Sequence, residues 1–256
     1  MKLMKNTLLV LLLLFSLQGF SQQLVVGPTL AAQASRARYD NPDFLNDYQN
    51  QLYYGFQAGL VVNYKLNNIL SFHTEYNYSR QGKRLQAEFF DEIRNTETYE
   101  FLRAPLYIRL QSRSEPGNFS YFFNAGPHLA YLLKASGTVR GTEEVLDNNL
   151  GQINYTLTRA NSTSTDAFRL QEMNRLFVGL DVGVGMLIPM YANKIGVELR
   201  YSIGHTNLSD NPGGYDELLL PDNTAAFSNH MLTFRVSYLL EFDLFEIRTK
   251  GKSTGK

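Results

Sequence analysis

The sequence predicts an all-β fold, an eight-stranded antiparallel up-and-down transmembrane β-barrel preceded by a cleaved signal peptide. Three observations favour it. Beyond the N-terminal segment, apolar and polar residues alternate with a period of two in eight segments. Most of these segments reach the ~9–11 residues that a tilted strand needs to cross a bilayer. The connections between the segments are alternately long and short.

Composition excludes several classes of protein. The chain has 256 residues, 44% hydrophobic and 19% charged, which is enough apolar material to bury a core and excludes wholesale disorder. Lys and Arg number 24 and Asp and Glu also 24, so no positive surplus is available for nucleic acid. Because the chain has no cysteine, disulfides, thiolate catalysis and cysteine-ligated metal sites are excluded.

The N-terminus has the order of a secretory signal peptide. Lys2 and Lys5 precede an apolar run over residues 8–15, and Gly19 and Ser21 are the small residues that a signal peptidase reads. No later stretch is as long as a membrane-spanning helix, so a membrane-resident form must cross with strands. We therefore expect a Sec-type signal peptide (residues 1–21), an outer-membrane barrel domain (residues 22–243) and a basic tail (residues 244–256).

In the first four segments the two faces are already distinct. The first segment alternates most weakly, whereas the second places Phe56 and Leu60 opposite Gln57 and Asn63. The third segment sets its tyrosines against serine, histidine and glutamate, and the fourth sets leucines against arginines. In order, these segments are residues 23–33, 54–65, 70–79 and 100–111.

The last four segments repeat the pattern. The fifth is rich in aromatic residues, and the sixth alternates valine or leucine with glycine or Asp181. The seventh carries Glu198 and Arg200 on its polar face, and the eighth carries Arg235. These segments are residues 119–134, 175–189, 195–205 and 230–242.

The connections favour a barrel over a sandwich. The long, polar ones are residues 34–52, 81–98, 135–173 and 205–228, and the short ones are residues 65–68, 112–118 and 190–194. Outer-membrane barrels have short periplasmic turns and long outer loops, whereas a Greek-key sandwich gives no reason for this alternation. For the longest connection two interpretations stay open: a mobile loop, or paired strands that extend above the membrane.

A β-sheet that spans a membrane must close into a barrel. Hydrocarbon offers no hydrogen-bond partner to the backbone, so the sheet must leave no free edge. The apolar face should meet lipid, with aromatic residues at both interfaces and the polar face inside. The tyrosines that we expect near strand ends are Tyr54, Tyr64, Tyr76, Tyr78, Tyr121 and Tyr201.

Several strings resemble the PorT-like outer-membrane β-barrel family of Bacteroidota. They lie in residues 100–111, 122–133, 179–185 and 198–208, and their most specific parts are Pro105, Gly126-Pro127 and Arg200-Tyr201-Ser202. The resemblance covers about residues 22–243 and implies an integral outer-membrane barrel. For a few members it also implies a part in assembling the type IX secretion machinery. The chain departs from the family at His205 and in its tail beyond Phe242.

Charged residues on the polar faces should fill the interior. An eight-stranded barrel is only wide enough for its own side chains, so we interpret these residues as a salt-bridged plug, with a gated ion path or catalytic carboxylates as the sharper alternatives. His73 and His128 lie nearby, and inward glycines should relieve crowding. The expected network is Glu75, Arg103, Arg109, Asp181, Glu198, Arg200 and Arg235. The inward glycines are Gly55, Gly59, Gly126, Gly179, Gly183, Gly185, Gly196 and Gly204.

No catalytic, cofactor or metal site is predicted. A histidine beside hydroxyls at the outer end of the seventh segment resembles the minimum of a lipid hydrolase, but its spacing fits a hydrogen-bonded loop root better. Acidic residues in the last long connection lack the spacing of a calcium loop. The first cluster is His205, Thr206, Asn207, Ser209 and Asp210, and the acidic residues are Asp210, Asp216, Glu217 and Asp222.

The sequence thus predicts a non-enzymatic protein of the cell outer membrane with a structural or partner-binding role, one version of which is a secretion-system accessory. The expected partners are outer-membrane lipid and lipopolysaccharide, together with secretion or envelope proteins, and not nucleic acid. A narrow solute or ion channel is the main alternative, and a lipid-modifying hydrolase is a weaker one. A soluble lipocalin-like carrier would need the opposite arrangement, with apolar residues inside.

Overall fold

The fold is known from a computed structural model, which describes residues 23–39, 48–87, 93–112, 118–141, 152–159, 167–170, 174–191, 193–206 and 227–243. The expected signal peptide and basic tail lie outside these residues. No helix long and apolar enough to span a bilayer occurs in the part of the chain that the structure describes. The described strands are β1 (Gln23–Tyr39), β2 (Tyr48–Gln51), β3 (Tyr53–Lys65), β4 (Leu70–Ala87), β5 (Arg94–Gln111), β6 (Ser120–Arg140), β7 (Gln152–Arg159), β8 (Ala167–Leu170), β9 (Leu176–Met190), β10 (Asn193–Gly204) and β11 (Phe227–Asp243).

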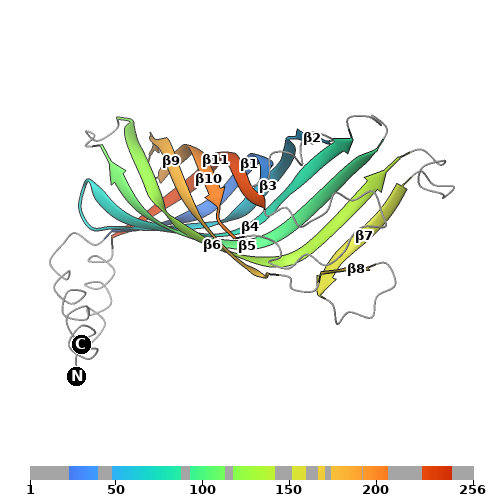
Figure 1. The fold of residues 1–256 in the computed structure, drawn as a ribbon. Coiled ribbons are helices and arrows are strands. Elements are labelled where there is room, and N and C mark those ends of the chain that lie inside the picture. Colours follow the sequence, from blue (N-terminus) through green and yellow to red (C-terminus); the bar gives the residue numbers. More distant parts are fainter. Residues whose placement is uncertain are drawn as a thin grey trace, which may run out of the picture.

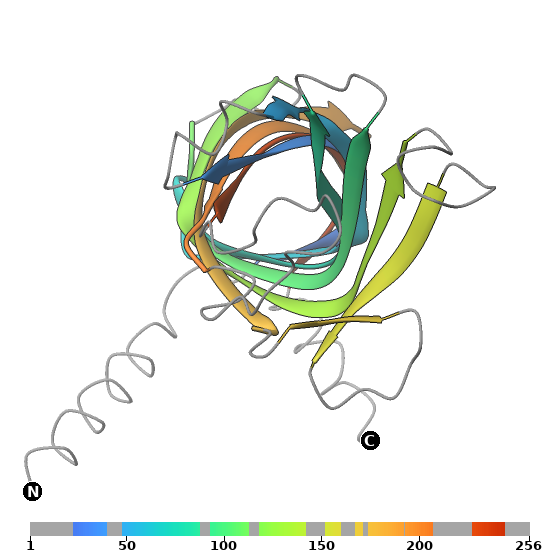
Figure 2. The same cartoon turned by 45° about the vertical axis from the view of Figure 1, so that its right-hand side comes forward.

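Eight of these strands close into a ring. Antiparallel pairing runs from β1 through β3, β4, β5, β6, β9, β10 and β11, and β11 pairs back to β1. Figure 2 shows the strands as a closed ring, with β7 and β8 outside it. Each ring strand corresponds to one predicted segment in the predicted order. The all-β, eight-stranded, up-and-down fold class is therefore confirmed.

The two faces of the ring have opposite chemistry. Leu30 and Tyr54 on the outer face are 67% and 72% exposed, whereas Arg200 and Arg235 on the inner face are each 2% exposed. Leaving such large apolar side chains in contact with water would be costly, whereas in hydrocarbon they lose nothing. The soluble lipocalin alternative is wrong, because its hydrophobic polarity would be the reverse.

One wall of the barrel is taller than the rest. β4, β5 and β6 contain 18, 18 and 21 residues, whereas the neighbouring β3 contains 13 and β10, opposite β4 in the ring, contains 12. At the end of this wall that carries the long connections, which we call its upper end, β2 pairs with β4 and β7 pairs with β6. β8 pairs in parallel with β7. Figure 1 shows β7 and β8 beside the right-hand end of β6, where they continue the sheet away from the ring.

The long strands of this wall, together with β1, correct the predicted limits of three long connections. Residues 34–39, 81–87, 94–98 and 135–140 were expected in loops but belong to strands. Most of their outward side chains are polar, for example Arg84 and Thr96, which is typical of a strand that has left the membrane. The inward side chains Leu85 and Val139 remain buried, so the period of two continues beyond the lipid-facing region. Two interpretations of residues 135–173 were open. The described part of this connection forms paired strands, because β7 pairs with β6 and with β8.

On the outer face of this wall, the lipid-facing belt of exposed apolar side chains ends where the outward residues change from apolar to charged. Tyr78 pairs with Leu102, and one row higher Arg80 pairs with Glu100. A β-bulge between β5 and β6 lies beside this boundary, where the register shifts at Glu100. Because β4 continues to Ala87, Tyr76 and Tyr78 lie within the strand and not near its end, which corrects their expected position. They were misplaced because the strand was expected to end where lipid-facing residues end.

Candidate functional site

The barrel interior is the candidate functional site, and five strands supply its charged residues. β4 contributes Glu75, β9 contributes Asp181, and β11 contributes Arg235; β5 and β10 contribute two residues each. All of them face inward and are at most 4% exposed. The seven residues that the sequence singles out are thus placed together: Glu75, Arg103, Arg109, Asp181, Glu198, Arg200 and Arg235.

The first cluster joins opposite walls of the ring. Arg200 donates from Nη1 and Nη2 to the two carboxylate oxygens of Glu75, at 3.0 and 2.6 Å. Arg200 also donates from Nε to Oε1 of Glu198 at 2.9 Å on its own strand. Nη1 of Arg235 lies 2.6 Å from Oε2 of Glu75, the oxygen that also accepts from Nη1 of Arg200. Glu75 therefore has a guanidinium on each of its oxygens.

Arg109 extends this cluster toward the short-turn end of the barrel. Its Nε donates to Oδ1 of Asn124 at 2.9 Å, and Nδ2 of Asn124 donates to Oε1 of Glu198 at 3.1 Å. The guanidinium carbon of Arg109 lies 4.0 Å from the ring centroid of Phe122, a cation–π distance. Below it, Phe122 and Leu187 belong to a buried apolar layer that fills this end.

The second cluster lies nearer the long-loop end. Nη2 of Arg103 donates to Oδ1 of Asp181 at 2.6 Å and to Oγ of Ser202 at 3.0 Å. Nδ1 of His128 lies 2.9 Å from the same Asp181 oxygen, and the Tyr107 hydroxyl donates to the other one. Tyr107 also connects the two clusters, because the guanidinium carbon of Arg200 lies 4.5 Å from its ring centroid.

This arrangement satisfies the buried charges of the interior with partners on other strands. A buried guanidinium or carboxylate is stable only when partners replace its water, and here each carboxylate has such partners from other strands. Four guanidiniums face three carboxylates, so the network retains one excess positive charge when the histidines are neutral. The inward-facing donors and acceptors therefore form hydrogen bonds and ion pairs with one another across the barrel axis.

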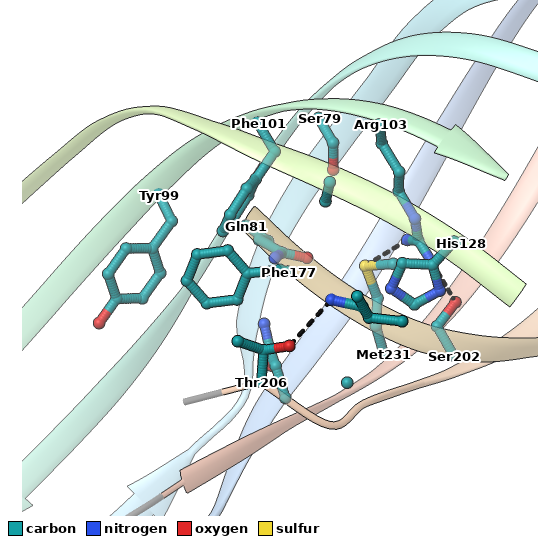
Figure 3. Close-up of a pocket in the computed structure, with 14 residues that line it drawn as sticks. Ser79, Gln81, Tyr99, Phe101, Arg103, His128, Phe177, Ser202, Thr206 and Met231 are labelled. Atoms are coloured by element: carbon teal, nitrogen blue, oxygen red, sulfur yellow. Dashed lines mark hydrogen bonds between the residues drawn. The ribbon is translucent and has the colours of Figure 1, made fainter. Parts of the chain in front are cut away.

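A small cavity lies above the second cluster and is drawn in Figure 3. Arg103, His128 and Ser202 lie on one side of it, and the rings of Phe101 and Phe177 lie on the other. The cavity measures about 50 Å³, which is well below the ~300–1,000 Å³ typical of ligand sites. It is therefore large enough for a few water molecules and too small for a solute in this conformation.

Sequence reasoning missed a buried cluster in the tall wall above the membrane. Nζ of Lys83 lies 3.2 Å from Oε2 of Glu97, and Tyr155 donates to Oε1 of Glu97 at 3.1 Å and to Asn95 at 3.0 Å. Tyr99 also donates to Glu97. A signal was present, because Glu97 and Tyr99 have the same parity as Arg103 and would face inward if the strand continued.

Two inward glycines show how tightly the interior is filled. A Cβ at Gly183 would collide with Oε1 of Glu198, and a Cβ at Gly179 would collide with the His128 ring. At Gly196, by contrast, the nearest atoms would lie at 3.4 Å, an ordinary contact. Glycine is thus required where the charged network approaches the wall and not everywhere along it.

The histidine cluster near the end of β10 is only partly within the described residues. The backbone nitrogen of His205 donates to the carbonyl of Val178 at 2.9 Å, and the Thr206 hydroxyl accepts from the nitrogen of Val178 at 2.9 Å. These bonds tie the end of β10 to β9, which agrees with a loop root. The other members of the cluster and the acidic residues 210, 216, 217 and 222 lie outside the described residues. Among the residues that are described, no group of three or more metal-ligating side chains occurs.

The closed ring, the lipid-facing apolar surface and the polar interior define an outer-membrane β-barrel protein. Residues 20–210 match the model of the outer membrane protein beta-barrel domain, and the chain belongs to that family. The search of curated proteins gives no match.

Several solved structures are similar to the chain. OprG from Pseudomonas aeruginosa is 9% identical with a TM-score of 0.49, covering 88% of this chain and 98% of that one. Ail of Yersinia pestis, in complex with the heparin analogue sucrose octasulfate, is 12% identical with a TM-score of 0.39, covering 85% and 99%. The outer membrane protease OmpT from Escherichia coli is 11% identical with a TM-score of 0.42, covering 88% and 100%.

Proposed function

We propose that this barrel is a non-enzymatic, closed-lumen protein that acts by presenting its tall outer wall to another component of the envelope. The observation that carries the proposal is the set of bonds across the lumen, above all those from Arg200 to Glu75. A transport pathway would have to break several buried ion pairs, at a cost of several kcal/mol each. The wall, in contrast, offers paired strands beyond the membrane.

The finer placement of the chain is part of this proposal. The resemblance to the PorT-like branch rests on Pro105, Gly126-Pro127 and Arg200-Tyr201-Ser202. Under the proposal the protein belongs to that branch and serves as an accessory of a secretion complex. The small cavity, the self-paired interior and the loop-root bonds of His205 support a role without catalysis.

A genetic experiment tests the role of the wall. In a deletion strain, the wild-type gene and a variant in which a short Gly-Asn linker replaces residues 142–173 would be compared for secretion, surface composition and envelope integrity. We expect the variant to give a heat-modifiable barrel that fails to restore the wild-type phenotype. A deletion strain that is unchanged in all three measurements would contradict the proposal.

Conductance in planar bilayers tests the closed lumen. We expect the wild-type protein to give no discrete steps, and Arg200→Ala combined with Arg235→Ala to give them, because both cations on Glu75 are then lost. An outward variant, Arg36→Ala, is the matched control and should stay silent. Discrete wild-type steps that change in Arg200→Ala would establish the narrow channel instead.

A further inference from the structure

A basic groove lies on the outer face of the tall wall, on β4, β5, β6 and β7. It measures about 560 Å³, within the ~300–1,000 Å³ range of ligand sites and far larger than the cavity in the lumen. Its lining combines arginines with hydroxyl and amide side chains. These are Arg80, Arg84, Arg94, Arg140, Thr96, Thr98, Ser136, Thr138, Asn154 and Thr156.

The strand register places two arginines of this groove directly opposite each other. Arg94 on β5 is directly opposite Arg140 on β6, and Arg84 on β4 is opposite Thr96, one row closer to the membrane. Like charges directly opposite each other on one face of a sheet are destabilising. An anion bound between Arg94 and Arg140 would attract both guanidiniums and offset their mutual repulsion.

The groove also has donors without partners. The Nε atoms of Arg84 and Arg94 are buried and have no hydrogen-bond partner. Within the described part of the chain, none of the four arginines forms a salt bridge with a carboxylate. Glu100 lies on the lowest row, opposite Arg80 and Lys134, and the rows above it carry no described carboxylate on this face.

The height of the groove indicates which anion it meets. Directly below it are the lipid-facing side chains Leu102 and Leu133, 52% and 53% exposed. The arginines one to four rows higher therefore lie at the level of the lipid headgroups, on the side with the long loops. Guanidinium groups in pairs, with hydroxyls beside them, are suited to phosphate, which accepts several charge-assisted hydrogen bonds at once.

We propose that this groove binds phosphate monoesters on the headgroup of a phosphorylated glycolipid of the outer leaflet. Arg94 and Arg140 hold one phosphate between them, Arg80 and Arg84 face the same cavity from β4, and the threonines bind the sugar hydroxyls. The inference requires only that the barrel resides in the membrane. It does not depend on the closed lumen or on a protein partner, so the two proposals can fail separately.

The test measures lipid binding to the full-length mature protein in detergent by native mass spectrometry. The probes are bisphosphorylated lipid A and the same lipid after enzymatic removal of its phosphates. The variant is Arg94→Gln with Arg140→Gln, and the matched control is Arg36→Gln with Arg38→Gln, two exposed outward arginines on β1 that do not line the groove. Heat-modifiable gel mobility shows that each variant is folded.

We expect bisphosphorylated lipid A to bind the groove variant at least about tenfold more weakly than wild type, with the control pair unchanged. Removal of the phosphates should weaken binding to wild type by a similar factor. Equal affinity for the two lipids, or an equal loss in the control pair, would overturn the proposal.

Inorganic phosphate distinguishes the lipid from a free anion. It would be added against lipid A at constant ionic strength, with chloride as the reference. Absence of displacement at millimolar phosphate supports the lipid headgroup as the ligand. Displacement at that concentration would assign the groove to free phosphate and overturn the assignment to lipid.

Discussion

Arg200 on β10 and Glu75 on β4 form a two-point ion pair across the barrel, with donor–acceptor distances of 3.0 and 2.6 Å. The two strands are not neighbours in the ring, so this pair fixes the distance between two walls. Arg235 shares the same carboxylate from a third strand. Glu75 is consequently the residue on which the interior network converges.

Replacing Glu75 with Gln should destabilise the barrel strongly. The side chain keeps its size, but Arg235 loses its carboxylate partner and Arg200 keeps only Glu198, so the buried guanidiniums are no longer balanced. Removing one partner of a buried ion pair costs about 3–5 kcal/mol. Guanidinium-induced unfolding in detergent, followed by gel mobility, should give a lower midpoint than wild type.

Glu100→Gln is the control for this change, since Glu100 faces outward above the lipid-facing belt and forms no ion pair with any residue that the structure describes. Its midpoint should stay close to that of wild type. Equal midpoints for Glu75→Gln and wild type would show that the network contributes nothing to stability.

Two glycine substitutions separate crowding from a general requirement for glycine. A Cβ at Gly126 would collide with the backbone carbonyl of Leu106, which cannot move without disturbing the sheet, whereas at Gly196 the nearest atoms would lie at 3.4 Å. Gly126→Ala should therefore lower the free energy of unfolding by about 1–3 kcal/mol, the usual cost of overpacking. Gly196→Ala should change it little. The same denaturation assay measures both, and similar losses at the two sites would refute the crowding explanation.

A charge placed on the outer face tests its contact with lipid. Leu106 is 61% exposed near the middle of the lipid-facing row of β5. In a bilayer, Leu106→Arg should cost about 2–4 kcal/mol. In water an exposed arginine would cost almost nothing. Refolding equilibria in lipid vesicles provide the measurement.

Leu110→Arg serves as the comparison on the same strand, near the periplasmic end. There the side chain can reach the interface, and the expected cost is about 0–1 kcal/mol. If the two variants were equally stable in vesicles, the outer face would not be in contact with hydrocarbon.

Most of the ring could be predicted because strand periodicity assigns each side chain to a face without knowledge of the rest of the fold. Asp181 and Glu198 were assigned to the interior on parity alone, and both are buried. The ends of the strands could not be predicted in the same way. Beyond Arg80 the outward residues become polar, so a strand above the membrane has the composition of a loop.

The partners within the interior were also beyond sequence reasoning. The pair on β10, Glu198 and Arg200, is two residues apart and could be anticipated. The contact of Arg103 with Asp181 joins residues 78 positions apart, and nothing local specifies it. The basic groove likewise depends on which residues of β4, β5, β6 and β7 share a row, which is a matter of register.

By itself, the sequence determined that this chain forms a lipid-exposed barrel with a charged interior, because a period of two and the absence of hydrogen-bond partners in hydrocarbon leave no other arrangement. Only the tertiary structure decided which charges meet across the lumen, how far the wall rises above the membrane, and that Arg94 lies opposite Arg140. Those features depend on the stagger between strands, and the stagger is set by packing across the whole ring.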